Sequence, residues 1–444
     1  MDDSASSYRG SGNGATLAPN TRAWRYRPAS LHPTLLALIV FQNLYNAFSP
    51  YLTLVLNLGM LVGLMLRNRV SVSPAATPII AAALAILGWL FVAVTVSSDA
   101  DPQVLLKYVR SAAAIVLFAL IFGSCTTPER LVVKAINFAF SFHILLIAIQ
   151  VVWPDTTSFT AVFFGFAREE SVLKDFAMRK LGASSSYDTA SLFSIAGLLF
   201  FAMQFVQTKK LKYLLAVVAA FAAALMSSRL GMAIALIVVI FFCLRLIWTA
   251  SLGGKVISLI SGGVIVAAAY ITLVPLLFHS LGISELQPDD AVIFFSATDY
   301  GTSGTLEALT QHHLEPLNQP FLELVLGYAV DPNTIGRFTD IGYVKFIYHV
   351  GIVGTVLILV LHFYILVVAH SIANRSELFS DRRLLANFLL FFIVITAVFN
   401  YKSLELYSRG TGDFIFLLFF CLVRSEDVRF VMHPLARSPK QSKP

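Results

Sequence analysis

The sequence predicts an all-α integral membrane protein that crosses the bilayer with about twelve helices. Of its 444 residues, 57% are hydrophobic and only 13% are charged, and the mean hydropathy is +0.77. Soluble chains carry roughly 25% charged residues, about twice that share. Folding alone cannot hide so much apolar surface from water, so we expect lipid to be the solvent of this chain.

About twelve apolar runs approach the roughly 17–25 residues that span a bilayer. In chain order they are 31–49, 51–66, 78–96, 104–123, 134–153, 188–206, 211–227, 229–248, 256–277, 342–370, 385–401 and 411–423. Polar tails, 1–30 and 424–444, flank a single transmembrane domain over 31–423. Most runs are joined by short turns, but 154–187 and 278–341 form long polar loops. The larger loop lies between the ninth and tenth predicted helices.

The positions of the basic residues predict the orientation of these helices. With the N-terminus in the cytoplasm, about two thirds of the 32 Lys and Arg residues lie in cytoplasmic segments, as the positive-inside rule requires. Both termini are therefore expected in the cytoplasm. The membrane orientation then accounts for the net charge of +7. We therefore expect no nucleic-acid partner.

Both long loops fall on the external side of this topology. The segment 278–341 contains nine acidic residues and a single basic one, Arg337. Long loops without secondary structure are uncommon unless they function. Within this loop, 303–325 predicts one or two short helices broken at Pro316 and Pro320.

The sequence favours neither a metal site nor a cofactor site. It contains no HExxH, CxxC or GxxxxGK[ST] pattern, which removes common zinc, redox and nucleotide signatures. Its cysteines, Cys125, Cys243 and Cys421, fall within or at the ends of apolar runs, so we expect no structural disulfide.

Arg229 is the most prominent candidate for substrate binding. It follows Met226-Ser227-Ser228 between two apolar runs that leave almost no loop for it. A charge embedded in the membrane costs roughly 2.5–3.5 kcal/mol even on insertion scales. A guanidinium that faces a cavity could bind an anionic substrate such as a phosphate. The competing interpretation is an interfacial arginine that extends to lipid headgroups.

Further candidates lie in the external loops. His312 and His313 could supply a general base, because an unperturbed imidazole titrates near neutral pH; the alternative is one packed and one solvated histidine. For the basic candidates the ordinary explanation is a solvated or anchoring charge. They are Arg168 and Arg179 in the first loop, and Lys402 and Arg409 on the turn that also carries Tyr401 and Tyr407.

Three segments together resemble a known superfamily. They are Ser-Ser-Arg-Leu-Gly at 227–231, Phe-Thr-Asp-Ile-Gly-Tyr-Val at 338–344, and Tyr-His-Val-Gly-Ile-Val-Gly at 348–354. Their order, spacing and common side of the membrane are similar to those of the Wzy-type polymerases and O-antigen ligases of bacterial surface polysaccharide assembly. The layout covers most of the chain, whereas the specific motifs cover only about forty residues.

The resemblance implies a metal-independent glycosyltransferase of the bacterial inner membrane, acting on undecaprenyl-pyrophosphate-linked oligosaccharides at the periplasmic face. It implies that Arg229, with Arg168 or Arg179, contacts the donor, and that Asp340 and Tyr343 belong to the site. Many relatives carry an arginine before the amphipathic helix of the large loop, where this chain has Ser303-Gly304-Thr305. The resemblance therefore leaves two alternatives: one phosphate contact is missing, or Arg337 supplies it. A chain-length-regulating membrane protein is an implied partner besides membrane lipid.

Two alternatives to a polymerase follow from the same features. Ligases of the superfamily carry a histidine near the end of the large loop, where this chain has Phe338-Thr339-Asp340, so polymerase is favoured over ligase. A twelve-helix secondary transporter fits the number of spans. However, the sequence offers no matched pair of Gly- or Pro-broken helices and no acidic residue in mid-span.

Overall fold

The computed structural model describes most of the predicted transmembrane domain. The described residues are 29–30, 32–47, 50–66, 72, 76–97, 100–126, 129–164, 180–184, 186–249, 320–335, 339, 341–401, 403–408 and 410–423. The predicted ninth span (256–277), both predicted tails except for residues 29 and 30, and most of the loop at 278–341 lie outside them.

Within the described residues the fold is helical, apart from one pair of two-residue strands. The helices are α1 (Pro33–Tyr45), α2 (Pro50–Met65), α3 (Thr77–Val96), α4 (Pro102–Ser124), α5 (Glu129–Val152), α6 (Thr156–Phe163), α8 (Tyr187–Thr208), α9 (Leu211–Leu225), α10 (Arg229–Thr249), α14 (Phe321–Leu326), α15 (Gly342–Arg375), α16 (Asp381–Phe399) and α17 (Thr411–Leu422). The strands β1 (Ala29–Ser30) and β2 (Cys125–Thr126) pair in parallel. A 3-10 turn covers Pro332–Ile335.

The predicted fold class, a polytopic helical membrane protein, is confirmed. Among the described residues, six helices are long and apolar enough to cross a membrane: α3, α4, α5, α8, α15 and α16. The remaining apolar helices have shorter apolar stretches than these six. They are α1, α2, α9, α10 and α17. Large apolar side chains such as Leu84, Phe91 and Phe363 are exposed on the helix surfaces, as lipid contact requires.

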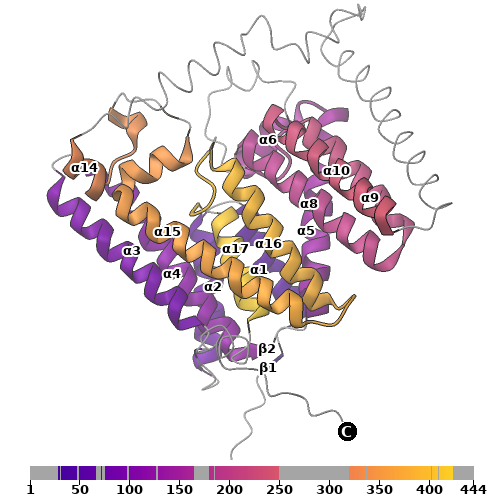
Figure 1. The fold of residues 1–444 in the computed structure, drawn as a ribbon, viewed down its shortest axis with the longest axis horizontal. Helices are drawn as coiled ribbons and strands as arrows, with labels where there is room; N and C mark the ends of the chain where they lie inside the picture. Colours follow the sequence, from indigo (N-terminus) through magenta and orange to yellow (C-terminus); the bar gives the residue numbers. More distant parts are fainter. Residues whose placement is uncertain are drawn as a thin grey trace, which may run out of the picture.

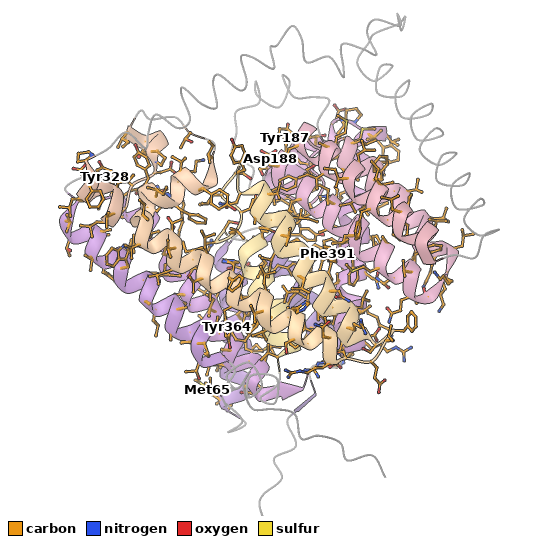
Figure 2. The ribbon with its side chains drawn as sticks, viewed as in Figure 1. Met65, Tyr187, Asp188, Tyr328, Tyr364 and Phe391 are labelled. Atoms are coloured by element: carbon orange, nitrogen blue, oxygen red, sulfur yellow. The ribbon has the colours of Figure 1, made fainter. Side chains whose placement is uncertain are left out.

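The helices form a bundle with two distinct ends (Figure 1). The lower end carries the strands β1 and β2, and the opposite, upper end carries α6 and α14. Tyr187 and Asp188, at the start of α8, also lie at the upper end (Figure 2). Helices joined by short described connections, such as α3 and α4 or α15 and α16, begin near the end of the bundle where the preceding one stops.

The centre of the bundle is packed with phenylalanine. Phe140 of α5, Phe200 of α8, Phe388 of α16 and Phe414 of α17 are fully buried. The ring centroids of Phe200 and Phe388 lie 4.8 Å apart at 62°. Edge-to-face contacts of this kind add to van der Waals packing, which holds helices together where lipid removes the usual hydrophobic drive.

A polar cluster joins α1 to α2. Gln42 Nε2 donates to Thr53 Oγ1 at 3.1 Å, and Asn57 Nδ2 donates to Asn43 Oδ1 at 3.1 Å. Asn46, in the left-handed conformation at the end of α1, accepts a hydrogen bond from Thr53 Oγ1. These side chains satisfy one another, and such bonds stabilise helix pairs in an apolar surrounding.

Helix α15 is broken at Gly351, which the apolar run at 342–370 did not predict. Gly351 has φ +65° and ψ −176°, a conformation open to glycine alone among the natural residues. A Cβ atom there would lie 2.1 Å from the carbonyl oxygen of Val325. The break therefore depends on close backbone contact with the end of α14.

The break leaves backbone carbonyls of α15 without partners in the helix, and groups from other elements donate hydrogen bonds to them. Tyr348 O accepts from Tyr328 N at 2.8 Å and His349 O from Ala329 N at 3.1 Å, while Val350 O accepts from the indole Nε1 of Trp89 at 2.9 Å. Unpaired carbonyls cost several kcal/mol in an apolar medium. The three bonds thus fix the upper part of α15 to α3 and to the segment after α14.

Candidate functional site

Buried polar side chains collect at the upper end of the bundle, around the loop between α16 and α17. The loop closes on Asn400, whose Oδ1 accepts from Glu405 N at 2.8 Å and from Leu406 N at 3.1 Å. Gly342, at the start of α15, packs directly on this loop, because a Cβ there would lie 2.5 Å from Ser403 O. The loop is therefore a fixed part of the bundle.

Glu405 is the centre of this loop. The residue is 4% exposed, and its carboxylate accepts three hydroxyl hydrogen bonds: from Thr189 Oγ1 at 2.9 Å, from Ser403 Oγ at 3.0 Å and from Thr411 Oγ1 at 2.8 Å. These donors join the start of α8 and the start of α17 to the loop. Burial raises the pKa of Glu405 and outweighs the hydroxyl donors, which lower it; the charge of Asp188 raises it further.

A stack of rings leads from this loop to the break in α15. Tyr407 stacks on Tyr108 of α4 with ring centroids 5.4 Å apart. The Tyr108 hydroxyl in turn lies 3.4 Å from His349 Nδ1, and the two rings meet edge to face at 5.9 Å. Burial, reinforced by the charge of Asp413, raises the pKa of Tyr407. The stack is a continuous path of polar rings across α4, α15 and the loop.

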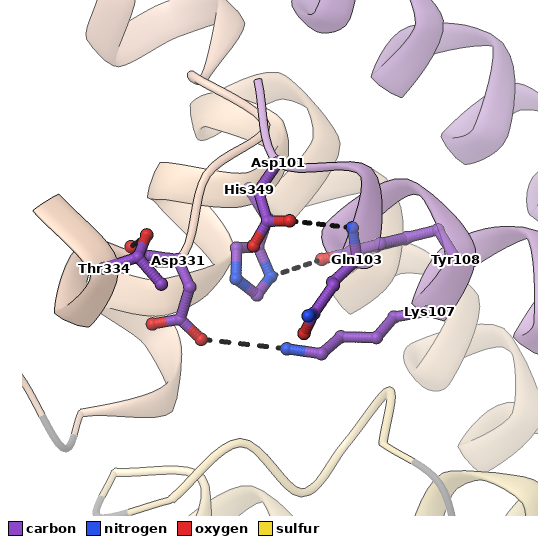
Figure 3. Close-up of polar contacts among 7 residues, drawn as sticks. All are labelled: Asp101, Gln103, Lys107, Tyr108, Asp331, Thr334 and His349. Carbon is purple, nitrogen blue, oxygen red and sulfur yellow. Dashed lines mark hydrogen bonds and ion pairs between the residues drawn. The ribbon is translucent and has the colours of Figure 1, made fainter. Parts of the chain in front are cut away.

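An ion pair lies beside His349. Lys107 Nζ is 3.7 Å from Asp331 Oδ2, and both side chains are partly exposed. Figure 3 shows the imidazole between Asp331 and Tyr108. Asp101 caps α4 by accepting from Gln103 N at 2.8 Å, and its own N–H donates to Ala329 O at 2.9 Å. These contacts hold the acidic segment after α14 against the start of α4.

The predicted tight turn before Arg229 is present. Helix α9 ends at Leu225 and α10 begins at Arg229. Ser228 Oγ accepts from Gly231 N at 3.1 Å and so caps the first turn of α10. Gly231 packs against Ser191 of α8, since a Cβ there would overlap its hydroxyl oxygen. This contact puts the start of α10 beside the α8 turn that binds Glu405.

The end of the predicted loop at 154–187 is tied to the same turn. Lys180 N donates to Met226 O at 2.9 Å, and Gln150 Oε1 of α5 accepts from Leu181 N at 3.0 Å and from Gly182 N at 2.9 Å. Lys180 is buried, and that burial lowers its pKa. The loop also starts with a helix, α6, that the sequence did not predict.

Several buried polar atoms of the upper end have no hydrogen-bond partner among the described residues. They are Arg110 Nε, Thr157 Oγ1, Ser191 Oγ, His349 Nε2, Asn400 Nδ2 and Tyr407 Oη. Tyr364 Oη, in the lower half (Figure 2), is a similar atom far from them. Native proteins leave few such atoms, and each calls for an explanation such as a bound molecule.

The structure describes only part of the predicted site. Tyr343 is described, and its hydroxyl donates to Ala397 O of α16 at 2.7 Å, so it joins two helices. Arg229 is described in its backbone alone. The remaining predicted residues lie outside the described part: Arg168, Arg179, His312, His313, Arg337, Asp340, Lys402 and Arg409.

Sequence reasoning did not select His349, Tyr108, Glu405 or Asp331 as site residues. Tyr348-His349 stood only within the resemblance motif, although a histidine before a glycine inside an apolar run was a usable signal. Glu405 belongs to the turn whose basic residues, Lys402 and Arg409, were explained by anchoring at the membrane interface. Within the described residues, no group of three or more His, Cys, Asp or Glu side chains is placed to hold a metal ion.

No protein-family model matches the chain, and no curated protein matches it in sequence. The resemblance described above therefore rests on the residues of the three segments.

Proposed function

We propose that the chain is a membrane glycosyltransferase that joins oligosaccharide repeat units carried on undecaprenyl pyrophosphate, as Wzy-type polymerases do. The observation that carries the proposal is the group of buried polar atoms at one end of the bundle that have no partner among the described residues. These atoms lie on helices α4, α6, α8 and α15 and on the loop between α16 and α17. A polar substrate held at a membrane surface would supply their partners.

The start of α10 suits the leaving group of such a reaction. Departure of the sugar leaves negative charge on a lipid pyrophosphate. An arginine forms bidentate, charge-assisted hydrogen bonds to phosphate. Arg229 is the first residue of a 21-residue helix, and a helix N-terminus itself favours an anion. In the proposed reaction Arg229, with Arg168 or Arg179, stabilises the developing charge without a divalent cation.

A general base must accept the proton of the acceptor sugar hydroxyl. The sequence offers His312, His313 and Asp340 for this role. The structure adds His349, whose buried Nε2 has no partner among the described residues and whose other nitrogen lies near Tyr108 Oη. We assign to His349 the task of holding or moving this proton beside the Lys107–Asp331 pair.

We place the upper end in the periplasm and both termini in the cytoplasm of a bacterial inner membrane. Basic residues of the described chain concentrate at the lower helix ends: Arg130, Lys134, Lys209, Lys210, Lys212, Arg375, Arg382 and Arg383. The positive-inside rule then puts that end in the cytoplasm. Lipid-linked glycan would reach the upper end from the outer leaflet, where a chain-length-regulating membrane protein is a further proposed partner.

Deletion of the gene followed by complementation tests the proposal. We expect the deletion to abolish high-molecular-weight glycan and to leave single repeat units on the lipid carrier. Wild type should restore the polymer and Arg229→Ala should not, although both insert equally in the membrane. Intact polymer in the deletion strain would remove the polymerase proposal, and long polymer that accumulates unligated would favour the ligase instead.

The broken α15 favours a second candidate, because interrupted helices form the ion sites of many secondary transporters. In this chain, however, the freed carbonyls of Tyr348, His349 and Val350 already accept hydrogen bonds. One of the two lone pairs of each carbonyl is therefore already engaged, which disfavours the coordination of an ion. We keep transport as the alternative, and uptake of a labelled sugar or ion by proteoliposomes would revive it.

A further inference from the structure

A groove of about 250 Å³ lies on the side of the bundle between α10 and α16, with α8 as its floor. It belongs to the lower half of the molecule, away from the polar stack around His349. Helix α8 contacts both α10 and α16. The ring centroids of Phe241 on α10 and Phe391 on α16 lie 6.4 Å apart. Phe391 is labelled in Figure 2.

The groove has a polar end and an apolar end. Gln207, Ser380, Arg383 and Asn387 line it toward the lower end of the bundle. The apolar walls extend to Leu199 and Phe391. A helix rises 1.5 Å per residue, so Leu199 and Gln207 lie about 12 Å apart along α8. Phe391 and Arg383 are separated by the same distance along α16. The groove is thus elongated along the helices and amphipathic from one end to the other.

The polar end carries a free positive charge. The guanidinium of Arg383 forms no ion pair or hydrogen bond with any described residue. Its backbone N–H is occupied, since it donates to Ser380 Oγ at the start of α16. Gln207 Nε2 donates to Phe379 O and fixes the connecting turn against α8. The cation lies at the mouth of the groove, and none of the described carboxylates, including those of Glu377 and Asp381 nearby, forms an ion pair with it.

The turn beside this cation has the features of a bilayer interface. Leu378 and Phe379 are 71% and 66% exposed, and Phe379 has φ +70°, which is uncommon outside glycine. Arg383 itself lies in the first turn of α16, at the end of a helix that is long and apolar enough to cross a membrane, where long basic side chains extend to the interface. We therefore expect the polar end of the groove at the depth of the lipid phosphates.

We propose that this groove binds one anionic glycerophospholipid of the leaflet on the β1–β2 side. The phosphodiester pairs with Arg383 and accepts from the amide of Asn387, while one acyl chain lies along Val238, Phe241 and Leu199. The length of the apolar walls and the single charge at their end select a phosphate-headed lipid. This site is independent of the glycosyl transfer proposed for the upper end.

Native mass spectrometry of the full chain, delipidated in detergent and titrated with palmitoyl-oleoyl-phosphatidylglycerol, tests the proposal. We expect one tightly retained lipid in wild type. Arg383→Gln should weaken its binding about tenfold, because a charge-assisted hydrogen bond is lost. Val238→Trp should fill the groove and weaken it at least as much.

Two variants serve as matched controls. Arg130→Gln removes an exposed cation at the same end, and Ile237→Trp adds an indole to an exposed position of α10 that does not line the groove. Both should bind the lipid as wild type does, and all variants should unfold at similar temperatures without lipid. Equal binding by wild type and both groove variants would overturn the site. Weaker binding by Val238→Trp alone would overturn the headgroup assignment.

Discussion

Two buried histidines show how differently two regions of this molecule are built. His143 of α5 has both ring nitrogens engaged: Nδ1 accepts from Ala183 N at 3.0 Å, and Nε2 lies 3.0 Å from Ala190 O. Because Nδ1 accepts, the neutral ring must donate through Nε2. His349 of α15 is equally buried, but its Nδ1 has a 3.4 Å contact and its Nε2 has no described partner.

The difference separates architecture from function. The His143 region fixes residues 180–184 between α5 and α8, and its polar atoms are used within the fold. The His349 region keeps a buried polar atom to which no described residue forms a hydrogen bond, although burial without a partner costs about 1–3 kcal/mol. Such an unpaired polar atom is best explained where a bound ligand forms the missing hydrogen bond.

The largest effect is expected at the break that shapes the His349 region. Gly351→Ala adds a Cβ 2.1 Å from Val325 O at φ +65°, so it should lower the unfolding free energy by about 3 kcal/mol or more. Thermal unfolding of the purified protein measures this. Gly88→Ala is the control, because no atom lies within 4 Å of its added Cβ. Equal melting temperatures for the two variants would show that the break is not required.

His349→Gln should reduce polymer synthesis by about a hundredfold, the usual contribution of a group that transfers a proton. Its unfolding free energy should change by only about 1 kcal/mol, since few bonds are lost. The rate of polymer formation by reconstituted protein, set beside its melting temperature, measures both. Full activity in this variant would remove His349 from the site.

His143→Gln should show the reverse pattern. The N–H of Ala183 and the carbonyl of Ala190 lose their ring partners, so the protein should be destabilised by about 2 kcal/mol. Polymer synthesis per folded molecule should stay near that of wild type. A variant that melts normally but is inactive would contradict the distinction between the two histidines.

Tyr343→Phe tests a predicted substrate-binding residue whose hydroxyl donates to Ala397 O. We expect a loss of about 1 kcal/mol in stability, the usual net value of one hydrogen bond, with normal activity. A strong loss of activity at unchanged stability would return Tyr343 to the substrate-binding role that the resemblance implies.

The smallest effect is a pH dependence at Glu405. Its folded-state pKa is raised, so the folded protein binds more protons than the unfolded chain between the two pKa values. The contribution of Glu405 to stability is therefore present below its unfolded pKa and is lost as the pH rises through the folded pKa. As the pH rises through this range, the melting temperature of Glu405→Gln should increase relative to that of wild type. A difference that does not vary with pH would show that Glu405 does not titrate in this way.

The helices of this fold could be predicted well from the sequence because lipid imposes a simple rule. Each long apolar run that is described became a helix with bounds within a few residues of the prediction, as α3, α8 and α15 illustrate. The tight turn between α9 and α10 was also predicted correctly. Helix α6 was not, because its eight residues are too few to give a membrane signal.

The break at Gly351 and the ring stack could not be predicted in the same way. Gly351 looks like any glycine in an apolar run, and its conformation depends on Val325 and Gly327, far away in the sequence. Likewise, Tyr108, His349 and Tyr407 meet only after α4, α15 and the last loop have packed. Pairings of this kind are tertiary, and hydropathy does not contain them.

The most direct test of the account is polymerisation by the purified chain. Protein reconstituted in liposomes is given an undecaprenyl-pyrophosphate-linked repeat unit in the presence of a metal chelator, and the products are separated by length. We expect a ladder of longer glycans from wild type and from His143→Gln, none from Arg229→Ala, and about a hundredfold less product from His349→Gln. Unchanged single repeat units with the wild-type protein, or an identical ladder from all four, would contradict it.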